Sequence, residues 1–326
     1  GPASYLGSFT LYKPAEFNND VKLWNFRFDQ AFNEYLNVLA TLGVIGLIVM
    51  IFITIIAVTA ALKTLSTPKI GSIRVPLAIS TIAFFVILAF HTSTLVFWVV
   101  GILLVVCFLT VTRESNNEIS LGVESSSGYY GLTPPKTSSL PIVIALIIIL
   151  LIGWVLYQTT QFLIADFHHR QGLKAFAAGQ GIVAYNEYIL AEKFNPNIDI
   201  YRSNLAQVNF AIANAIAKAK GPTEASPAGS LTDQDKQTIQ TFLSQAITEG
   251  QVATTLNPNN PGNWEILGSI YRQISGVAQD AFQYALDAYG RAIQKDPLNP
   301  NLRMVVGEIY LSVNNPDMAI RFFTDA

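Results

Sequence analysis

The sequence predicts an all-α protein in which polytopic transmembrane helices, about four in this chain, precede an extracytoplasmic solenoid of helical repeats. Its mean hydropathy is +0.38 and only 13% of its residues are charged, whereas an ordinary soluble domain carries about 25%. Apolar runs are concentrated between residues 42 and 163, and a pattern of small, aromatic and proline residues recurs after residue 165. The first feature predicts membrane helices, and the second predicts stacked helical hairpins.

Composition and charge exclude several classes of protein. The formal net charge is −2, which provides no basic field, so nucleic acid is not an expected partner. A single cysteine, Cys107, lies in an apolar run and has no partner cysteine for an intramolecular disulfide. The three histidines are His91, His168 and His169, and this spacing fits no metal site. We therefore expect neither a metal nor another cofactor.

Four apolar runs have lengths near the roughly 20 residues that a helix needs to cross a bilayer. They cover residues 42–62, 75–90, 94–112 and 140–163. Core helices of a soluble protein are the alternative, but four such runs in close succession favour the membrane. The predicted organisation is therefore the end of an extracytoplasmic loop at 1–35, a transmembrane region at 36–165 and a repeat domain at 166–326.

The loops between these runs predict the orientation. The loop 63–74 contains Lys63, Lys69 and Arg74 and no acidic residue, so it is predicted to be cytoplasmic. The turn "HTST" has no Lys or Arg and is predicted to lie outside, and the polar loop 113–139 is then inside again. Alternation places both the first 35 residues and the repeats on the extracytoplasmic side of the cytoplasmic membrane.

The repeats resemble tetratricopeptide repeats, about four of them. In that pattern, small residues allow two helices to approach closely, aromatic residues fill the groove between them, and proline closes the turn. The matching residues are Ala184, Tyr188 and Pro196 in one unit, Trp264, Gly268 and Tyr271 in another, and Ala285, Tyr289 and Pro297 in the helix that follows. The resemblance implies a concave surface that binds a protein partner or an acceptor molecule.

A polar stripe leads into the first apolar run. If residues 29–62 form one continuous helix, then Gln30, Asn33, Asn37 and Thr41 lie on one face of it. Polar groups at membrane depth usually face a bundle interior or a water-filled cavity, so the stripe is a candidate cavity wall. The alternative is an amphipathic helix entry that is solvated by lipid headgroups.

The stretch "NEYLNVLATLGVIG" at 33–46, together with the aromatic- and glycine-containing segment before it, resembles the O-antigen ligase/polymerase family. The resemblance covers about residues 1–112 and implies a membrane glycosyltransferase of the C type. Such an enzyme transfers or polymerises an undecaprenyl-pyrophosphate-linked glycan at the outer face of the membrane. The lipid bilayer and the lipid-linked glycan are then expected partners, and we expect the chain to be part of a longer protein.

The resemblance implies a set of site residues. Glu34 and Asn33 match the family's motif and are the predicted catalytic residues. Arg27 and Lys13 are the cations available to bind the pyrophosphate, because glycan transfer requires positive charge at the leaving group.

The family's histidine, its expected general base, is replaced here by Phe32. Glu34 or Asp29 takes over as the base, or transfer proceeds without a side-chain base, or the protein is not such an enzyme. The alternative function is non-enzymatic: a membrane-anchored scaffold whose repeats recruit proteins of envelope assembly. A transporter is disfavoured, since no predicted span is broken at its centre or carries a buried charge.

Overall fold

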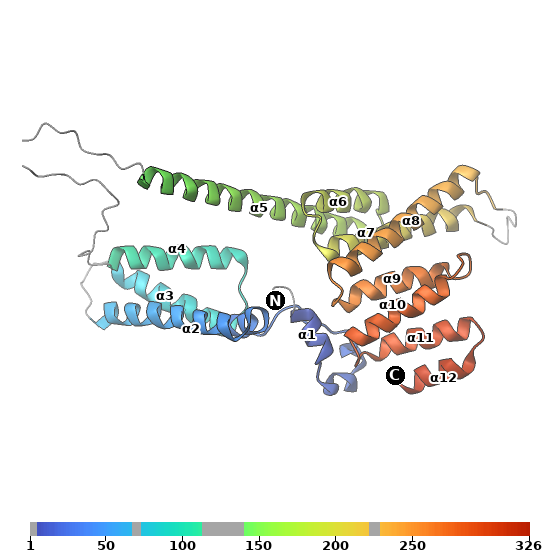
Figure 1. The fold of residues 1–326 in the computed structure, drawn as a ribbon, viewed down its shortest axis with the longest axis horizontal. Helices are drawn as coiled ribbons and strands as arrows, with labels where there is room; N and C mark the ends of the chain where they lie inside the picture. The colour runs from blue at the N-terminus through green and yellow to red at the C-terminus, as the bar shows by residue number, and fades with distance from the viewer. Residues whose placement is uncertain (1–4, 67–72, 113–139, 222–228) are drawn as a thin grey trace, which may run out of the picture.

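The computed structural model describes residues 5–66, 73–112, 140–221 and 229–326, and these residues form helices and turns without a strand. Lys69 and the loop 113–139, which entered the predicted orientation, lie outside the described residues. Figure 1 shows an apolar helical region at one end of the molecule and an array of helical hairpins at the other. A short N-terminal segment, helix α1 (Tyr5–Leu11) and two 3-10 turns (Ala15–Asn19, Val21–Leu23), lies between them.

The apolar region near the N-terminus is a bundle of α2 (Glu34–Ser66), α3 (Arg74–Phe90) and α4 (Leu95–Thr112). Helix α3 packs against both α2 and α4. The buried residues of its core cluster are Met50, Ala57, Phe84, Phe85 and Leu88. Aromatic contacts dominate this core, with the ring of Phe84 in contact with three neighbouring aromatic rings.

Two helices, rather than the predicted four, are long and apolar enough by length and composition to cross a membrane. These are Glu34–Ser66 and Val143–Ala177 within the described residues. The predicted spans at 75–90 and 94–112 form shorter apolar helices, Arg74–Phe90 and Val96–Thr112. At about 1.5 Å per residue, a 17-residue helix is about 26 Å long, less than the roughly 30 Å of a hydrocarbon core.

The predicted continuous helix over residues 29–62 is not formed. Helix α2 begins at Glu34, so Gln30 precedes the helix. A kink follows at Gly43, where φ is +75° and ψ is −171°. The sequence predicted one regular helix because composition does not show which glycine adopts a positive φ, a conformation that glycine reaches readily. The side chains of Asn37 and Thr41 therefore lie on a short first section of α2, and the Thr41 hydroxyl donates to the Asn37 carbonyl at 2.7 Å.

We expect Gly43→Ala to destabilise the bundle by about 1–2 kcal/mol, because an L-residue is strained at this φ. No side chain lies within 4 Å of the added methyl group, so strain is the only cause. Gly153→Ala is the matched control, since its methyl group also meets no neighbour and its helix gains about 0.5–1 kcal/mol of propensity. Thermal unfolding of both variants in lipid nanodiscs should give opposite shifts.

Helix α5 runs without interruption from Leu140 to Ala177. The predicted boundary between membrane region and repeats, at residue 165, lies inside this helix, and so do His168 and His169, which precede its last turns. The apolar half of α5 is exposed in the described structure, whereas its last turns pack against α6. The apolar helix is thus covalently and structurally continuous with the first hairpin of the array (Figure 1).

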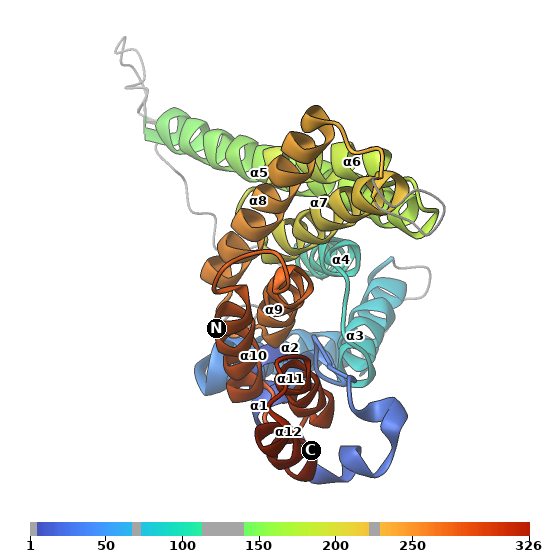
Figure 2. The same ribbon diagram turned by 90° about the vertical axis from the view of Figure 1, so that its right-hand side faces the viewer.

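The array pairs α5 with α6, α7 with α8, α9 with α10 and α11 with α12, and successive pairs stack side by side (Figures 1 and 2). We refer to it as the hairpin array. Its further helices are α6 (Gly181–Phe194), α7 (Asp199–Lys220), α8 (Asp233–Leu256), α9 (Pro261–Ile274), α10 (Ala281–Lys295), α11 (Pro300–Ser312) and α12 (Pro316–Thr324).

The residues that carried the repeat pattern lie at the contacts between paired helices. Ala184 and Ala285 are fully buried, and Tyr188 is 1% exposed. A methyl group on Gly268 would lie 2.9 Å from the ring of Tyr289, so only glycine permits this approach of α9 to α10.

The remaining pattern residues close turns or fill the core. Pro196 and Pro297 lie in the turns before α7 and α11, and Tyr271 belongs to the largest core cluster. The Trp264 indole donates to the Pro258 carbonyl at 2.9 Å. The repeat pattern therefore identified the packing residues of the array.

Candidate functional site

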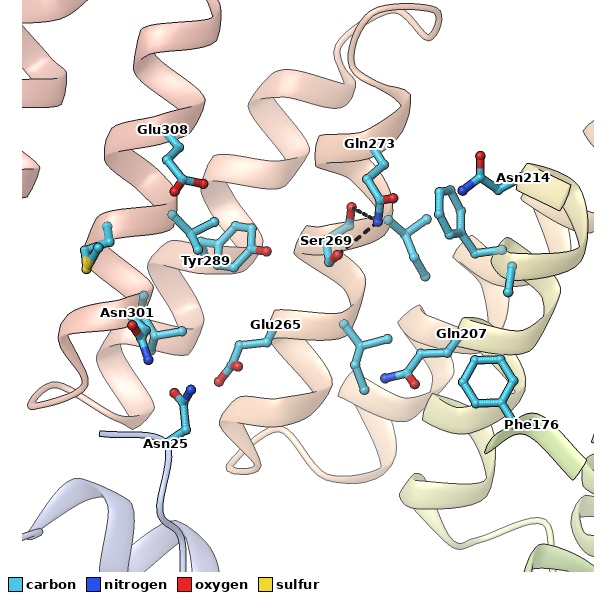
Figure 3. A pocket seen from close by; sticks show the side chains of 17 residues that line it. Asn25, Phe176, Gln207, Asn214, Glu265, Ser269, Gln273, Tyr289, Asn301 and Glu308 are labelled. Atoms are coloured by element: carbon cyan, nitrogen blue, oxygen red, sulfur yellow. Dashed lines mark hydrogen bonds between the residues drawn. The ribbon is translucent and has the colours of Figure 1, made fainter. Parts of the chain in front are cut away.

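A groove with a volume of about 760 Å³ lies on the hairpin array. Its walls come mostly from the first helix of each hairpin: α5, α7, α9 and α11. Figure 3 shows side chains from these helices converging on the groove, with Phe176 at one end and Asn301 at the other. Because equivalent helices of stacked hairpins line one surface, this is the concave face of the array.

One polar row crosses the groove at equivalent positions of three helices. Gln207, Ser269 and Glu308 each lie eight residues after the first residue of their helix (207 − 199, 269 − 261 and 308 − 300). The Gln273 amide donates to the Ser269 hydroxyl at 3.2 Å (Figure 3). The sequence analysis missed this row. Aligning the helices on Gly268 and Gly307, which pack against the second helix of their hairpins, would have revealed it.

The two ends of the groove differ in chemistry. Phe176 of α5 lies at one end of the groove (Figure 3), and Phe210 of the next inner helix, α7, also lines it. Glu308 and Glu265 lie toward α11 and α9. Among the residues that the structure describes, the groove lining contains amides, hydroxyls, two carboxylates and apolar side chains but no Lys or Arg.

The N-terminal segment contacts the array through Arg27. Its guanidinium donates from Nε to Asp296 Oδ2 at 2.8 Å and from Nη2 to Glu265 Oε1. Asp296 is fully buried, and the Arg27 side chain is 16% exposed. Burial alone would lower the pKa of Arg27, but the two carboxylates outweigh it and raise that pKa. We call this group of three residues the Arg27 clasp.

The clasp places a loop residue at the end of the groove. Asn299 donates to the side-chain oxygen of Asn25 at 3.1 Å, and Asn25 lines the groove beside Glu265 and Asn301 (Figure 3). Burial raises the pKa of Glu265, an effect that the charge of Arg27 opposes. The groove is therefore built from the array and the N-terminal segment together.

Lys13, the second predicted pyrophosphate ligand, is 3% exposed. Its ammonium group donates to the carbonyl oxygens of Leu23 at 3.0 Å and Trp24 at 2.8 Å. Burial lowers its pKa, while the charge of Asp296 acts in the opposite direction. Lys13 thus holds the N-terminal segment in shape, near the clasp. Lys13 and Arg27 both lie in the N-terminal segment, and the charged group of each donates to oxygen atoms of this chain.

Asn33 and Glu34, the predicted catalytic residues, lie at the start of α2. The Asn33 side chain accepts from the Leu36 N–H at 2.9 Å, as a helix cap does. Glu34 is 6% exposed and accepts from the N–H of Ser93 at 2.8 Å and from its hydroxyl at 3.0 Å. Glu34 therefore joins α2 to the turn between α3 and α4, and Phe32 beside it is 76% exposed.

No group of three or more His, Cys, Asp or Glu side chains within the described ranges is arranged to hold a metal ion. His168 instead contacts Glu187, with 2.8 Å between Nδ1 and Oε2. His169 Nε2 lies 2.8 Å from the Asn204 amide nitrogen. Both histidines thus join α5 to the helices that follow it.

Comparison with known proteins adds a structural likeness. No protein-family model matches the chain, and no curated protein sequence matches it. Among solved structures, the crystal structure of a thermophilic TPR (tetratricopeptide-repeat) protein from Thermus thermophilus is similar at a TM-score of 0.26 and 17% identity. The match covers 50% of this chain and 89% of that one.

Proposed function

We propose that this chain is a membrane-anchored tetratricopeptide-repeat protein that binds a polypeptide in the concave groove of its hairpin array. The observation that carries the proposal is the polar row across α7, α9 and α11, flanked by aromatic side chains. Amides and hydroxyls both donate and accept hydrogen bonds, so they suit the backbone of an extended chain. The absence of Lys and Arg from the groove lining disfavours an anionic ligand.

The Arg27 clasp supports a topology for the proposal. Arg27 precedes α2, whereas its partners Glu265 and Asp296 follow α5. Because these residues are in contact, the segment before α2 and the array after α5 lie on the same side of the bilayer. The two long apolar helices satisfy this condition with one crossing each. Lys63 lies in the last turn of α2 and Arg74 begins α3, and positive residues favour the cytoplasm. The array is then extracytoplasmic, and the membrane is the cytoplasmic membrane.

The proposal is tested with a displayed library of random peptides, selected on the full chain in lipid nanodiscs. We expect enriched peptides whose binding Ser269→Trp weakens at least tenfold, because the indole fills the centre of the groove. Gln283→Trp is the matched control, since Gln283 is exposed on the outer helix α10. Gln207→Trp repeats the block at a second position if Ser269→Trp lowers the helix content. Failure to enrich any peptide, or equal binding by the groove and control variants, would contradict the proposal.

Glycan transfer is a second candidate function, and the position of the N-terminal segment favours it. The resemblance assigns this segment to the transfer site, and the clasp places it at the end of a groove that suits an acceptor. An acceptor hydroxyl would attack the anomeric carbon of the lipid-linked glycan and break its bond to the pyrophosphate oxygen. The hydroxyl proton would pass to a base, for which Glu34 is the candidate, and the lipid pyrophosphate would leave.

Transfer requires Arg27 to exchange its carboxylate partners for phosphate, and Glu34 to release Ser93. The test follows glycan transfer from an undecaprenyl-pyrophosphate oligosaccharide to an envelope acceptor fraction, with the full-length protein. We expect Arg27→Ala and Glu34→Gln to reduce transfer at least a hundredfold if this function holds, while Lys236→Ala, which breaks an exposed ion pair, leaves it unchanged. An absence of transfer by the wild-type protein would leave peptide binding as the function.

A further inference from the structure

We propose that the groove selects one kind of polypeptide: an extended segment in polyproline II conformation, apolar at the α5–α7 end and cationic at the α11 end. This inference rests on the proposed peptide-binding function and names its ligand class. Three features of the groove carry it: the spacing of the polar row, the charge at one end, and the aromatic side chains at the other.

The spacing of the row matches the repeat of a polyproline II helix. Gln207, Ser269 and Glu308 come from successive inner helices at equivalent positions. Of these helices, α7 packs directly against α9, and packed helices lie about 8–10 Å apart. A polyproline II helix rises about 3.1 Å per residue with three residues per turn, or about 9.3 Å per turn. Helices α7 and α9 therefore meet the same face of such a peptide one turn apart, and one further turn toward α11 gives about seven residues for the whole row.

The α11 end of the groove presents carboxylates, of which Glu308 is the more exposed. Glu308 has a side chain that is 56% exposed, and its ion pair with Arg272, at 2.8 Å, is on the surface. Such pairs contribute about 0–1 kcal/mol, so a ligand cation can compete for Glu308. Glu265 adds negative charge nearby, although the clasp binds one of its oxygens. Arg272 and Arg27 contact these carboxylates from outside the groove lining, and no Lys or Arg among the described residues lines the groove itself. A Lys or Arg of the ligand therefore meets carboxylates here, whereas an acidic residue meets no cation in the lining.

The opposite end presents aromatic side chains. Phe176 is 37% exposed, and Phe210 is partly buried against two core clusters of the array. Aromatic-lined grooves bind proline rings and apolar side chains of preformed polyproline II segments, which lose little entropy on binding. The groove therefore has a direction, from its apolar α5–α7 end to the carboxylates at its α11 end, that a neutral glycan would not require.

The test measures binding of two labelled nonapeptides to the full chain by fluorescence anisotropy. One has the sequence Leu-Pro-Phe-Pro-Ala-Pro-Lys-Pro-Lys, and the other carries Glu in place of both Lys residues; each is also made with the sequence reversed. The nanodiscs contain only phosphatidylcholine, so that an anionic bilayer does not attract the basic peptide. A neutral N-acetylglucosamine tetramer serves as the competitor for the alternative that the groove binds glycan.

We expect a basic peptide, in one of its two directions, to bind at least tenfold more tightly than either acidic peptide. Glu308→Gln should weaken that binding about threefold to tenfold, and Phe210→Ala should weaken it at least as much. Asp287→Asn is the matched control, because Asp287 is also an exposed acid paired with an arginine, but on the outer helix α10. It should leave binding unchanged.

Equal binding of basic and acidic peptides, or insensitivity to Glu308→Gln, would overturn the inference. If library peptides of another kind bind in a manner that Ser269→Trp blocks, the inference fails while the proposed peptide-binding function stands. If no peptide binds and the sugar tetramer does, both fail.

Discussion

Replacing Arg27 with alanine should release the N-terminal segment from the hairpin array at a cost of about 3–5 kcal/mol in docking free energy. The reason is the environment of its partners rather than the number of hydrogen bonds. Asp296 is fully buried, and the Glu265 side chain is 29% exposed. Removal of the guanidinium leaves two carboxylates close together without a cation, and like charges at this separation repel.

The measurement is hydrogen–deuterium exchange of residues 13–28 in the full chain in nanodiscs, expressed as protection factors. Arg170→Ala is the control, since Arg170 is 73% exposed and paired with Asp166 within one helix, so its loss should change stability by less than about 0.5 kcal/mol. Unchanged protection in Arg27→Ala would show that the clasp does not hold the segment.

The loss should depend on pH. Burial raises the pKa of Glu265, and Arg27 is the main group that opposes this rise, so the pKa rises further in Arg27→Ala. A carboxyl with a raised pKa in the docked state binds more protons there than in the undocked state, so docking becomes more favourable as the pH falls. The protection that the variant loses at pH 7 should therefore be partly restored at pH 5. A loss of protection that is independent of pH would indicate that the segment is released by lost packing of the Arg27 side chain rather than by repulsion between the carboxylates.

Replacing Tyr188 with alanine should destabilise the first hairpin by about 3–5 kcal/mol, the usual cost of deleting a large buried aromatic ring. The ring is 1% exposed and packs in a core cluster with Leu205 and Val208. It also covers Gly172 of α5, where an added methyl group would lie 2.6 Å from the ring. Because α5 continues into the apolar region, loss of this contact loosens the array from the long apolar helix.

Protease cleavage between α5 and α6, and thermal unfolding in nanodiscs, measure the effect. Tyr12→Ala is the control, since Tyr12 is 80% exposed and should change stability by less than about 0.5 kcal/mol. Burial also raises the pKa of Tyr188 to about 12. The stability that its neutral form contributes is present below the ordinary pKa of 10.0 and is lost as the pH rises toward about 12. Tyr188→Phe should lose less stability than wild type over this range.

Local patterns predicted the elements of the array well. Small and aromatic residues at fixed spacing identified Ala184, Tyr188 and Tyr289 as packing residues, and the structure buries all three of them. Such patterns succeed because a helical hairpin packs against its immediate neighbours in sequence. The same reasoning overestimated the membrane spans, since hydropathy does not separate a short apolar helix from one that crosses a bilayer.

The sequence by itself determined that this protein is all-helical, that apolar helices precede an array of hairpins, and which residues pack each hairpin. Only the tertiary structure decided what surrounds Arg27, Lys13 and Glu34. Arg27 bonds to Asp296, 269 positions away, and Glu34 bonds to Ser93, 59 positions away. Periodicity and composition describe neighbours in sequence, whereas an ion pair over such a separation depends on how whole hairpins stack. For the same reason the groove, whose wall comes from five helices and one loop residue, appears only in the folded molecule.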